Sequence, residues 1–222
     1  MSFYLILDQA KIQKKYEFLS RAEVKFYSFV ADDQLSLPGL DQLLSTANPD
    51  EVRANIEEMR PRVRAMAKTI VSKWESVQIN NVRANHVFGF GDTGKVLFRA
   101  NRIPDFIDWI MLVIEIDEDV RELGAKLDDF ITDDEIDDLS RNVLKLAGAV
   151  ATPQYMAAVA IGKFVMKKTA ALMKENKNDQ LGLVEQSFTR EMHYPLGKRQ
   201  VDGTQDLTGN MWYDYTIFGL DE

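Results

Sequence analysis

The stretch Asp108–Ile116 reads Asp-Trp-Ile-Met-Leu-Val-Ile-Glu-Ile, and it decides the fold. Apolar residues follow one another between Asp108 and Glu115, without the alternation of a half-exposed strand. A short apolar run of this kind predicts a β-strand that is buried on both faces.

Strand patterns occupy further regions of the sequence, which are residues 3–12, 23–31, 76–99 and, as two closing strands, 180–192 and 210–218. In residues 23–31, Val24, Phe26 and Val30 alternate with polar and aromatic residues, which fits a pleated surface. Residues 76–99 alternate again and are interrupted by Gly91-Asp92-Thr93-Gly94. These turn-forming residues predict a β-hairpin.

Two regions change to a helical period, residues 37–75 and 117–175. Val52, Ile56 and Met59 recur at helical spacing in the first region, and Thr132 with Glu135 forms a candidate capping box in the second. Because strands pair across turns and not through regular strand–helix alternation, an antiparallel sheet is favoured. The predicted fold class is therefore α+β, a single domain over residues 1–222 in which an antiparallel sheet or β-sandwich carries two helical insertions.

Composition excludes several classes of function. The chain has 222 residues, a net charge of -8 and no cysteine. The lack of cysteine excludes disulfide scaffolds, thiolate metal sites and cysteine nucleophiles. The negative charge argues against a nucleic-acid partner. Neither a secretory signal nor an apolar run long enough to cross a bilayer is recognisable, so a cytoplasmic location is expected.

The segment Gly89–Lys95 matches two glycine-rich phosphate-binding patterns. Both patterns require a helix after the loop, because the backbone amides at a helix N-terminus hold the phosphate. Residues 95–99 instead have the pattern of a strand. A turn is therefore favoured over a nucleotide site.

Acidic residues suggest calcium as a ligand. Seven carboxylates lie within residues 128–138, and calcium takes six to eight oxygen ligands. The spacing differs from an EF-hand, and early acidic residues also suit the start of a helix. A second set of acidic loop residues would form a calcium site if the loops met at one end of the sandwich, and its members are Asp32, Asp33, Asp117, Asp119 and Asp206. Each of these residues alone also fits a solvated turn.

The helix expected from Pro153 to Lys174 carries Lys163, Lys167 and Lys174 on one narrow stripe beside a wide apolar arc. A basic amphipathic helix can lie on an anionic membrane or dock on a partner. A core helix with one solvated stripe has the same pattern, so both interpretations stay open.

Candidates for catalysis are few. His86 lies on the apolar face of a strand, as a core histidine does, and His193 leaves a later strand. Ser187 precedes His193 without a nucleophile elbow, and no metal-hydrolase motif is present. The aromatic tail around Trp212 fits either a recognition surface or a closing strand with one buried aromatic face.

Four features together resemble a C2-type β-sandwich, a fold of calcium-dependent and calcium-independent membrane-binding modules. They are the strand from residue 3, the turn at Gly91–Gly94, the strand Trp109–Ile116 with its acidic continuation Asp117-Glu118-Asp119, and the closing strand that ends in residues 214–219. The resemblance implies a β-sandwich that binds membranes or proteins. It covers about half of the chain.

The expected function is a non-enzymatic binding module that contacts a membrane surface or a protein partner, with calcium as a candidate ligand. Lys163, Lys167 and Lys174 are the expected contact residues. The alternatives are a membrane-perturbing, toxin-like effector and a structural subunit that self-assembles into a larger particle.

Overall fold

The computed structural model describes residues 2–14, 22–35, 37, 39–40, 44, 56–116, 129–146, 152–175, 180–194 and 197–220. The chain divides into two compact units. The first unit comprises Met1–Asp32, Glu75–Asp119 and Met173–Glu222, and the second comprises Asp33–Trp74 and Val120–Leu172. The second unit coincides within a few residues with the two expected helical insertions. The single domain over residues 1–222 stays a prediction.

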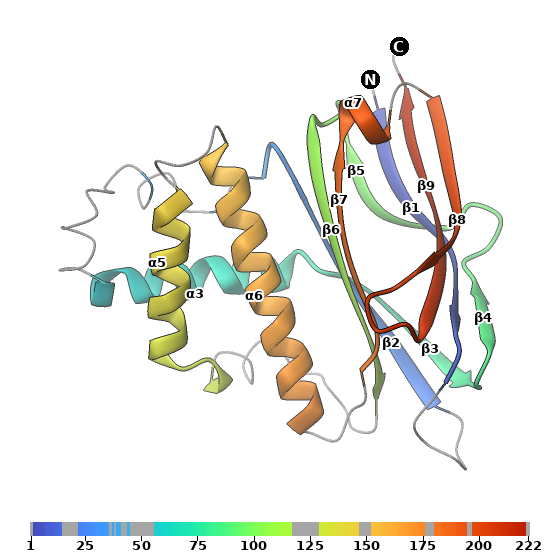
Figure 1. The fold of residues 1–222 in the computed structure, drawn as a ribbon, viewed down its shortest axis with the longest axis horizontal. Coiled ribbons are helices and arrows are strands. Elements are labelled where there is room, and N and C mark those ends of the chain that lie inside the picture. The colour runs from blue at the N-terminus through green and yellow to red at the C-terminus, as the bar shows by residue number, and fades with distance from the viewer. Residues whose placement is uncertain are drawn as a thin grey trace. The chain divides into compact units, whose positions relative to one another are not determined.

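The first unit contains two antiparallel sheets (Figure 1). Sheet A is formed by β1 (Ser2–Ile12), β4 (His86–Gly89), β5 (Lys95–Ala100), β8 (Gly197–Gln205) and β9 (Met211–Leu220). Sheet B is formed by β3 (Glu75–Val82), β2 (Ala22–Asp32), β6 (Phe106–Ile116) and β7 (Gln180–Thr189), in this order across the sheet. The α+β class and the antiparallel pairing are thus as predicted.

Strand β6 is central in sheet B, where it pairs with β2 on one side and β7 on the other. Its residues from Ile107 to Glu115 are all buried, on both faces of the sheet. The prediction from the apolar run is therefore confirmed.

The two sheets share one hydrophobic core, which gives the first unit a sandwich-like build. The ring of Trp109 on β6 makes edge contacts with Tyr213 and Tyr215 on β9, at centroid distances of 5.4 and 5.7 Å. Each such aromatic pair adds about 0.5–1.5 kcal/mol beyond its buried area. The indole nitrogen of Trp109 donates to Ser28 Oγ at 3.0 Å, so the polar atom of this buried side chain has a partner.

The prediction of a β-hairpin at Gly91–Gly94 is wrong, because β4 and β5 do not pair with each other. Both β4 and β5 pair antiparallel with β1, with Gly89 opposite Gln9 and Lys95 opposite Leu7. The chain therefore continues in one direction along β1 and makes an excursion over residues 90–94. Gly91 and Gly94 both have positive φ, so the predicted turn is present. Such turn residues can interrupt an edge strand as well as connect the two strands of a hairpin.

Two features near the C-terminus differ from expectation, the end of β7 and an additional strand. Strand β7 ends at Thr189, and a short helix α7 (Arg190–His193) follows in place of the expected strand end at residue 192. The loop expected before the last strand contains β8. Val201 is the one aliphatic side chain in β8, so the segment has no apolar alternation to reveal a strand.

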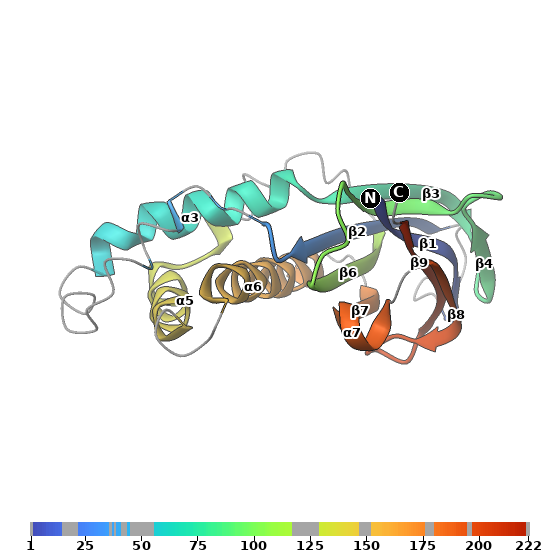
Figure 2. The ribbon, with the colours of Figure 1, turned by 90° about the horizontal axis from the view of Figure 1, so that it is seen from above.

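The second unit contains the helices α3 (Ile56–Ser72), α5 (Asp133–Leu146) and α6 (Pro153–Glu175), which Figure 2 shows from above. The predicted capping box begins α5: Thr132 N donates to Glu135 Oε2 at 3.1 Å, and Glu135 N donates to Thr132 Oγ1 at 3.4 Å. None of the helices in the described part of the chain combines the length and apolar character needed to cross a bilayer.

Replacement of Gly94 by Ala tests the interrupted edge strand. A Cβ atom at Gly94 would overlap Ile6 Cγ2 and lie 2.9 Å from the backbone oxygen of Leu7, at a φ of +67°. Gly91 has a φ of +77° but open space around it, so Gly91→Ala is the matched control. In urea unfolding, G91A should lower the free energy of unfolding by about 1–2 kcal/mol, the cost of a left-handed backbone. G94A should lower it by more, and equal losses would contradict the close approach to β1.

Candidate functional site

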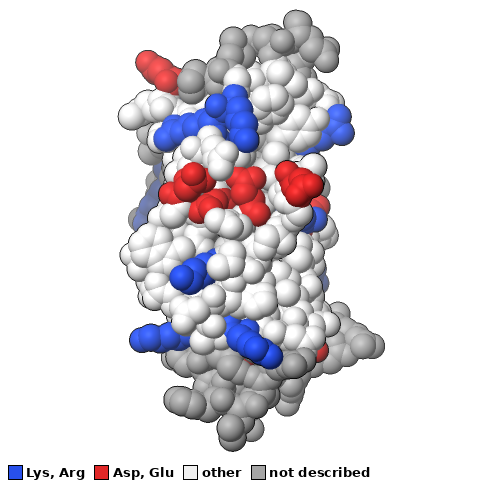
Figure 3. Space-filling model, turned by 90° about the vertical axis from the view of Figure 1, so that its right-hand side faces the viewer, with Lys and Arg blue, Asp and Glu red and all other residues white. Residues whose placement is uncertain are grey.

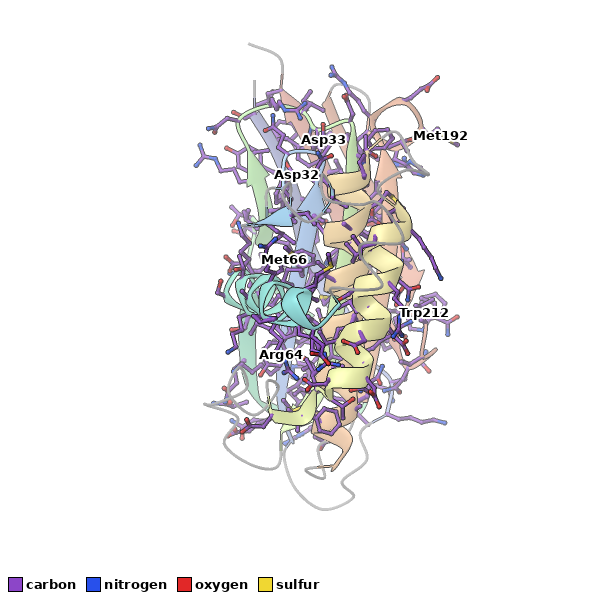
Figure 4. All side chains as sticks on the ribbon, turned by 90° about the vertical axis from the view of Figure 1, so that its left-hand side faces the viewer. Asp32, Asp33, Arg64, Met66, Met192 and Trp212 are labelled. Carbon is purple, nitrogen blue, oxygen red and sulfur yellow. The ribbon has the colours of Figure 1, made fainter. Side chains whose placement is uncertain are left out.

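The loops that follow β2 and β6, which were expected to carry calcium ligands, start from opposite ends of sheet B. Asp32 ends β2 opposite Ile107, and Asp33 follows it in a turn (Figure 4). Ile116, the residue before Asp117, pairs with Glu23. Residues 23 and 32 are nine positions apart on β2, which is about 30 Å along a strand. The loops therefore start from opposite ends, and Asp117 and Asp119 themselves lie outside the described residues.

Asp206 is buried, and hydrogen bonds within the protein occupy both of its carboxylate oxygens. Oδ1 accepts from Met211 N at 2.8 Å, and Oδ2 accepts from Leu183 N at 2.8 Å and from Thr208 Oγ1 at 2.6 Å. The carboxylate thus ties the turn between β8 and β9 to strand β7. These contacts assign a structural role to Asp206.

Among the described residues, no group of three or more histidine or acidic side chains has the arrangement of a metal site. The described part of the acidic run 128–138 makes ion pairs within the second unit instead. Arg60 Nε lies 2.7 Å from Asp137 Oδ1, and Arg64 Nη2 lies 3.0 Å from Asp133 Oδ1. Lys168 forms an ion pair with Glu135. Calcium binding stays a prediction.

These ion pairs change the pKa of two carboxyl groups. The hydrogen bond from Arg60 lowers the pKa of Asp137 below its usual value, although burial opposes this shift. Burial alone would raise the pKa of Glu135, but hydrogen bonds from Lys168 and Thr132 outweigh it and lower the pKa. Helices α3, α5 and α6 are therefore linked by side chains that are charged at neutral pH.

The three lysines expected to form a contact surface lie on α6. Lys167 is exposed, Lys163 is partly exposed, and the side chain of Lys174 lies outside the described residues. The apolar arc of the helix is buried, including Val159, Ile161, Val165, Met166 and Leu172. This burial fits the interpretation of a core helix with one solvated stripe.

The candidates for chemistry are not brought together. Ser187 Oγ donates to Asp108 Oδ1, whereas His193 Nδ1 accepts from Thr189 N at 3.0 Å. His86 is partly buried and its ring lies 4.7 Å from that of Phe88. Strand β5 follows the segment Gly89–Lys95 directly, so this segment lacks the helix of a phosphate-binding loop.

The outer face of sheet A carries a row of side chains that the sequence analysis did not single out. Register aligns Arg99 on β5, Tyr4 on β1, Phe218 on β9 and Lys198 on β8. The Arg99 guanidinium lies 5.6 Å from the centre of the Tyr4 ring, within the range of a cation–π contact. Alternation in β1 and β9 could have revealed this face, since buried neighbours flank Tyr4 and Phe218.

Further along this face, aliphatic side chains give way to acidic ones. Val96 is 42% exposed and pairs with Ile6. Beyond this pair, Asp8 Oδ2 accepts from Thr216 Oγ1 at 2.7 Å, and Asp214 accepts hydrogen bonds from Gln9 and from Gly203 N. Figure 3 shows the acidic side chains as a band across the face, with basic side chains above and below it.

The same face continues past the acidic band to Lys11 and Trp212, which pair across β1 and β9. Trp212 is 36% exposed, whereas its neighbour Tyr213 is buried. The expectation that the tail buries one aromatic face is thus confirmed, and Trp212 lies on the other face.

No protein-family model matches the chain, and no curated protein matches it.

Asp206→Asn tests the structural role of Asp206. The amide would place an NH2 group against backbone N–H donors, so we expect the free energy of unfolding to fall by about 1.5–3 kcal/mol. The loss should be equal in calcium and in excess chelator. Exposed Asp92 provides the control, since D92N should have little effect. A loss that appears only in calcium would assign a metal ligand to this position.

Replacement of Arg60 by Gln tests the ion pair with Asp137. The folded-state pKa of Asp137 is lowered, so this contribution to stability is present above the ordinary pKa of aspartate and is lost as the pH falls through the lowered value. Thermal unfolding should therefore show a large decrease in midpoint for R60Q at pH 7 and a smaller one near pH 2. Arg141→Gln breaks an exposed pair with Asp138 and should change the midpoint little at either pH. A decrease for R60Q that is independent of pH would refute the assignment.

Proposed function

We propose that the chain is a non-enzymatic binding module that contacts a protein partner through the outer face of sheet A. The observation that carries the proposal is the combination of exposed apolar side chains and charges of both signs on one face of sheet A. Tyrosine, tryptophan and arginine dominate the energetics of protein interfaces, and this face carries Tyr4, Trp212 and Arg99.

A protein partner is favoured over a membrane surface on electrostatic grounds. Asp8 and Asp214 lie within the face, and the chain carries a net charge of -8. An anionic bilayer repels carboxylates at its surface. Moreover, most of the described apolar arc of α6 is buried, with Met156 as an exposed exception, so the amphipathic helix that would lie on a bilayer has little free apolar surface among the described residues.

A C2-like sandwich is the fold that we propose for the first unit, supported by two antiparallel sheets that enclose one core. The outer face of sheet A would then be one of the two broad surfaces of the sandwich. This proposal requires neither calcium nor a catalytic residue.

Site-specific crosslinking tests the proposed function. A benzophenone side chain is placed at Trp212 or Val96, and the variants are irradiated in cells of the source organism. Both positions lie on the outer face of sheet A, so we expect an adduct of the same mass at each. Ser76 of β3 is an exposed control position on sheet B and should give no such adduct.

Vesicle sedimentation supplies the opposite outcome. The wild-type chain and a K163E/K167E/K174E variant are mixed with phosphatidylcholine–phosphatidylserine vesicles, in calcium and in chelator. A membrane surface would be the target if two results were obtained together. The wild type would sediment with the vesicles while the triple variant did not, and positions 212 and 96 would give no adduct.

A further inference from the structure

Strand β8 forms an edge of sheet A with no further strand beside it in the described part of the chain. Its residues from Gly197 to Gln200 are exposed. An edge strand presents unpaired backbone N–H and C=O groups, which can pair with another strand. Such an edge needs a cover, a disruption or a partner.

Strand β7 is an edge of sheet B, and other segments of the chain form hydrogen bonds with its backbone. In β7, Leu183 N donates to Asp206 Oδ2 and Leu183 O accepts from Leu207 N, both at 2.8 Å. Further along, Thr189 N donates to His193 Nδ1 at 3.0 Å. The turn that follows β8 thus protects β7, whereas among the residues that the structure describes no comparable backbone contact protects β8 over residues 197–201.

The charged side chains on the outer face of β8 form a self-complementary pattern, whereas Arg199 lies opposite the buried Ile217 and so belongs to the other face. Lys198 and Gln200 lie opposite Phe218 and Thr216, so both are on the outer face of sheet A. Gln200 Nε2 donates to Asp202 Oδ1 at 3.0 Å, which places Asp202 on the same face. Along this face the order is therefore a cation, a neutral amide and an anion, at every second residue.

We propose that β8 pairs antiparallel with β8 of a second copy of this chain, about a two-fold axis at Gln200. Residues equally distant from the axis then lie opposite each other. Lys198 of each copy faces Asp202 of the other, and the two Gln200 side chains meet at the axis. Opposite charges at directly facing positions stabilise antiparallel pairs.

Charge complementarity selects a second copy as the occupant. An entirely acidic strand would match Lys198 but oppose Asp202, and an entirely basic strand would do the reverse. A copy of β8 in antiparallel orientation satisfies both residues at once. Symmetric interfaces of this kind are self-complementary by construction.

The interface is expected to be weak and reversible. It involves one short strand from each copy, and the register of β8 shifts between Val201 and Thr204, which limits its regular length. The inference goes beyond the proposed function and uses the edge of sheet A, whereas the proposed partner contacts its face.

Sedimentation velocity over a concentration series tests the proposal on the full chain. The wild type should show a reversible monomer–dimer equilibrium. Lys198→Asp and Asp202→Lys each place like charges opposite each other at two symmetric positions, so each should weaken dimerisation about tenfold or more, since opposed like charges are destabilising. High salt should reduce this difference between variants.

Recombining the charges gives the decisive comparison. An equimolar mixture of K198D and D202K should form heterodimers, because each copy then presents the charge that the other requires. The double variant K198D/D202K should dimerise like the wild type. Exposed Lys11 lies on β1 inside the sheet, so K11D is a matched charge reversal that should leave dimerisation unchanged.

Three outcomes would overturn the proposal. The first is a wild type that stays monomeric at millimolar concentration. The second is a pair of single variants that dimerise like the wild type while circular dichroism shows both to be folded. The third is a mixture of the single variants that fails to restore association. None of these outcomes bears on the crosslinks at Trp212 and Val96, so the two proposals can fail separately.

Discussion

Removal of β6 from water on both faces is the constraint on which the first unit depends. A strand with apolar side chains in both directions cannot lie on a solvated surface, because each exposed side chain forfeits about 1.5–3 kcal/mol of burial energy. Pairing with β2 and β7 satisfies its backbone, and the aromatic rings of β9 pack on Trp109. Ser28 accepts the only hydrogen bond that the indole can donate, so the largest core side chain has one defined orientation.

Patterns that depend on burial were readable from the sequence, and patterns that depend on pairing were not. The apolar run of β6, the alternation in β2 and the capping box at Thr132 each reflect a local requirement. Strand β8 has almost no apolar residues because it is an exposed edge, so its strand character comes from backbone pairing with β9. Gly91 and Gly94 predict a turn, but they do not indicate that the strands before and after it both pair with β1.

The candidate site shows the same division. Acidic residues in loops are visible in a sequence, whereas strand register decided that Asp32 and Ile116 lie at opposite ends of sheet B. In the sequence, Asp206 resembled a metal ligand because nothing there shows that backbone N–H groups donate to both of its carboxylate oxygens. The row from Arg99 to Lys198 crosses four strands that are remote in sequence, and its members become neighbours only through the order of sheet A.

The second unit is assembled from two segments, residues 33–74 and 120–172, between which the chain builds strands β3 to β6 of the first unit. During synthesis, α3 leaves the ribosome before the carboxylate of Asp137 exists to receive Arg60. Its apolar side chains Val63, Met66 and Ile70, which are fully buried in the finished fold, must wait in water while β3 to β6 are made. The nascent chain therefore has a window in which an exposed helix is open to chaperones and to aggregation, and the length of that window is set by topology.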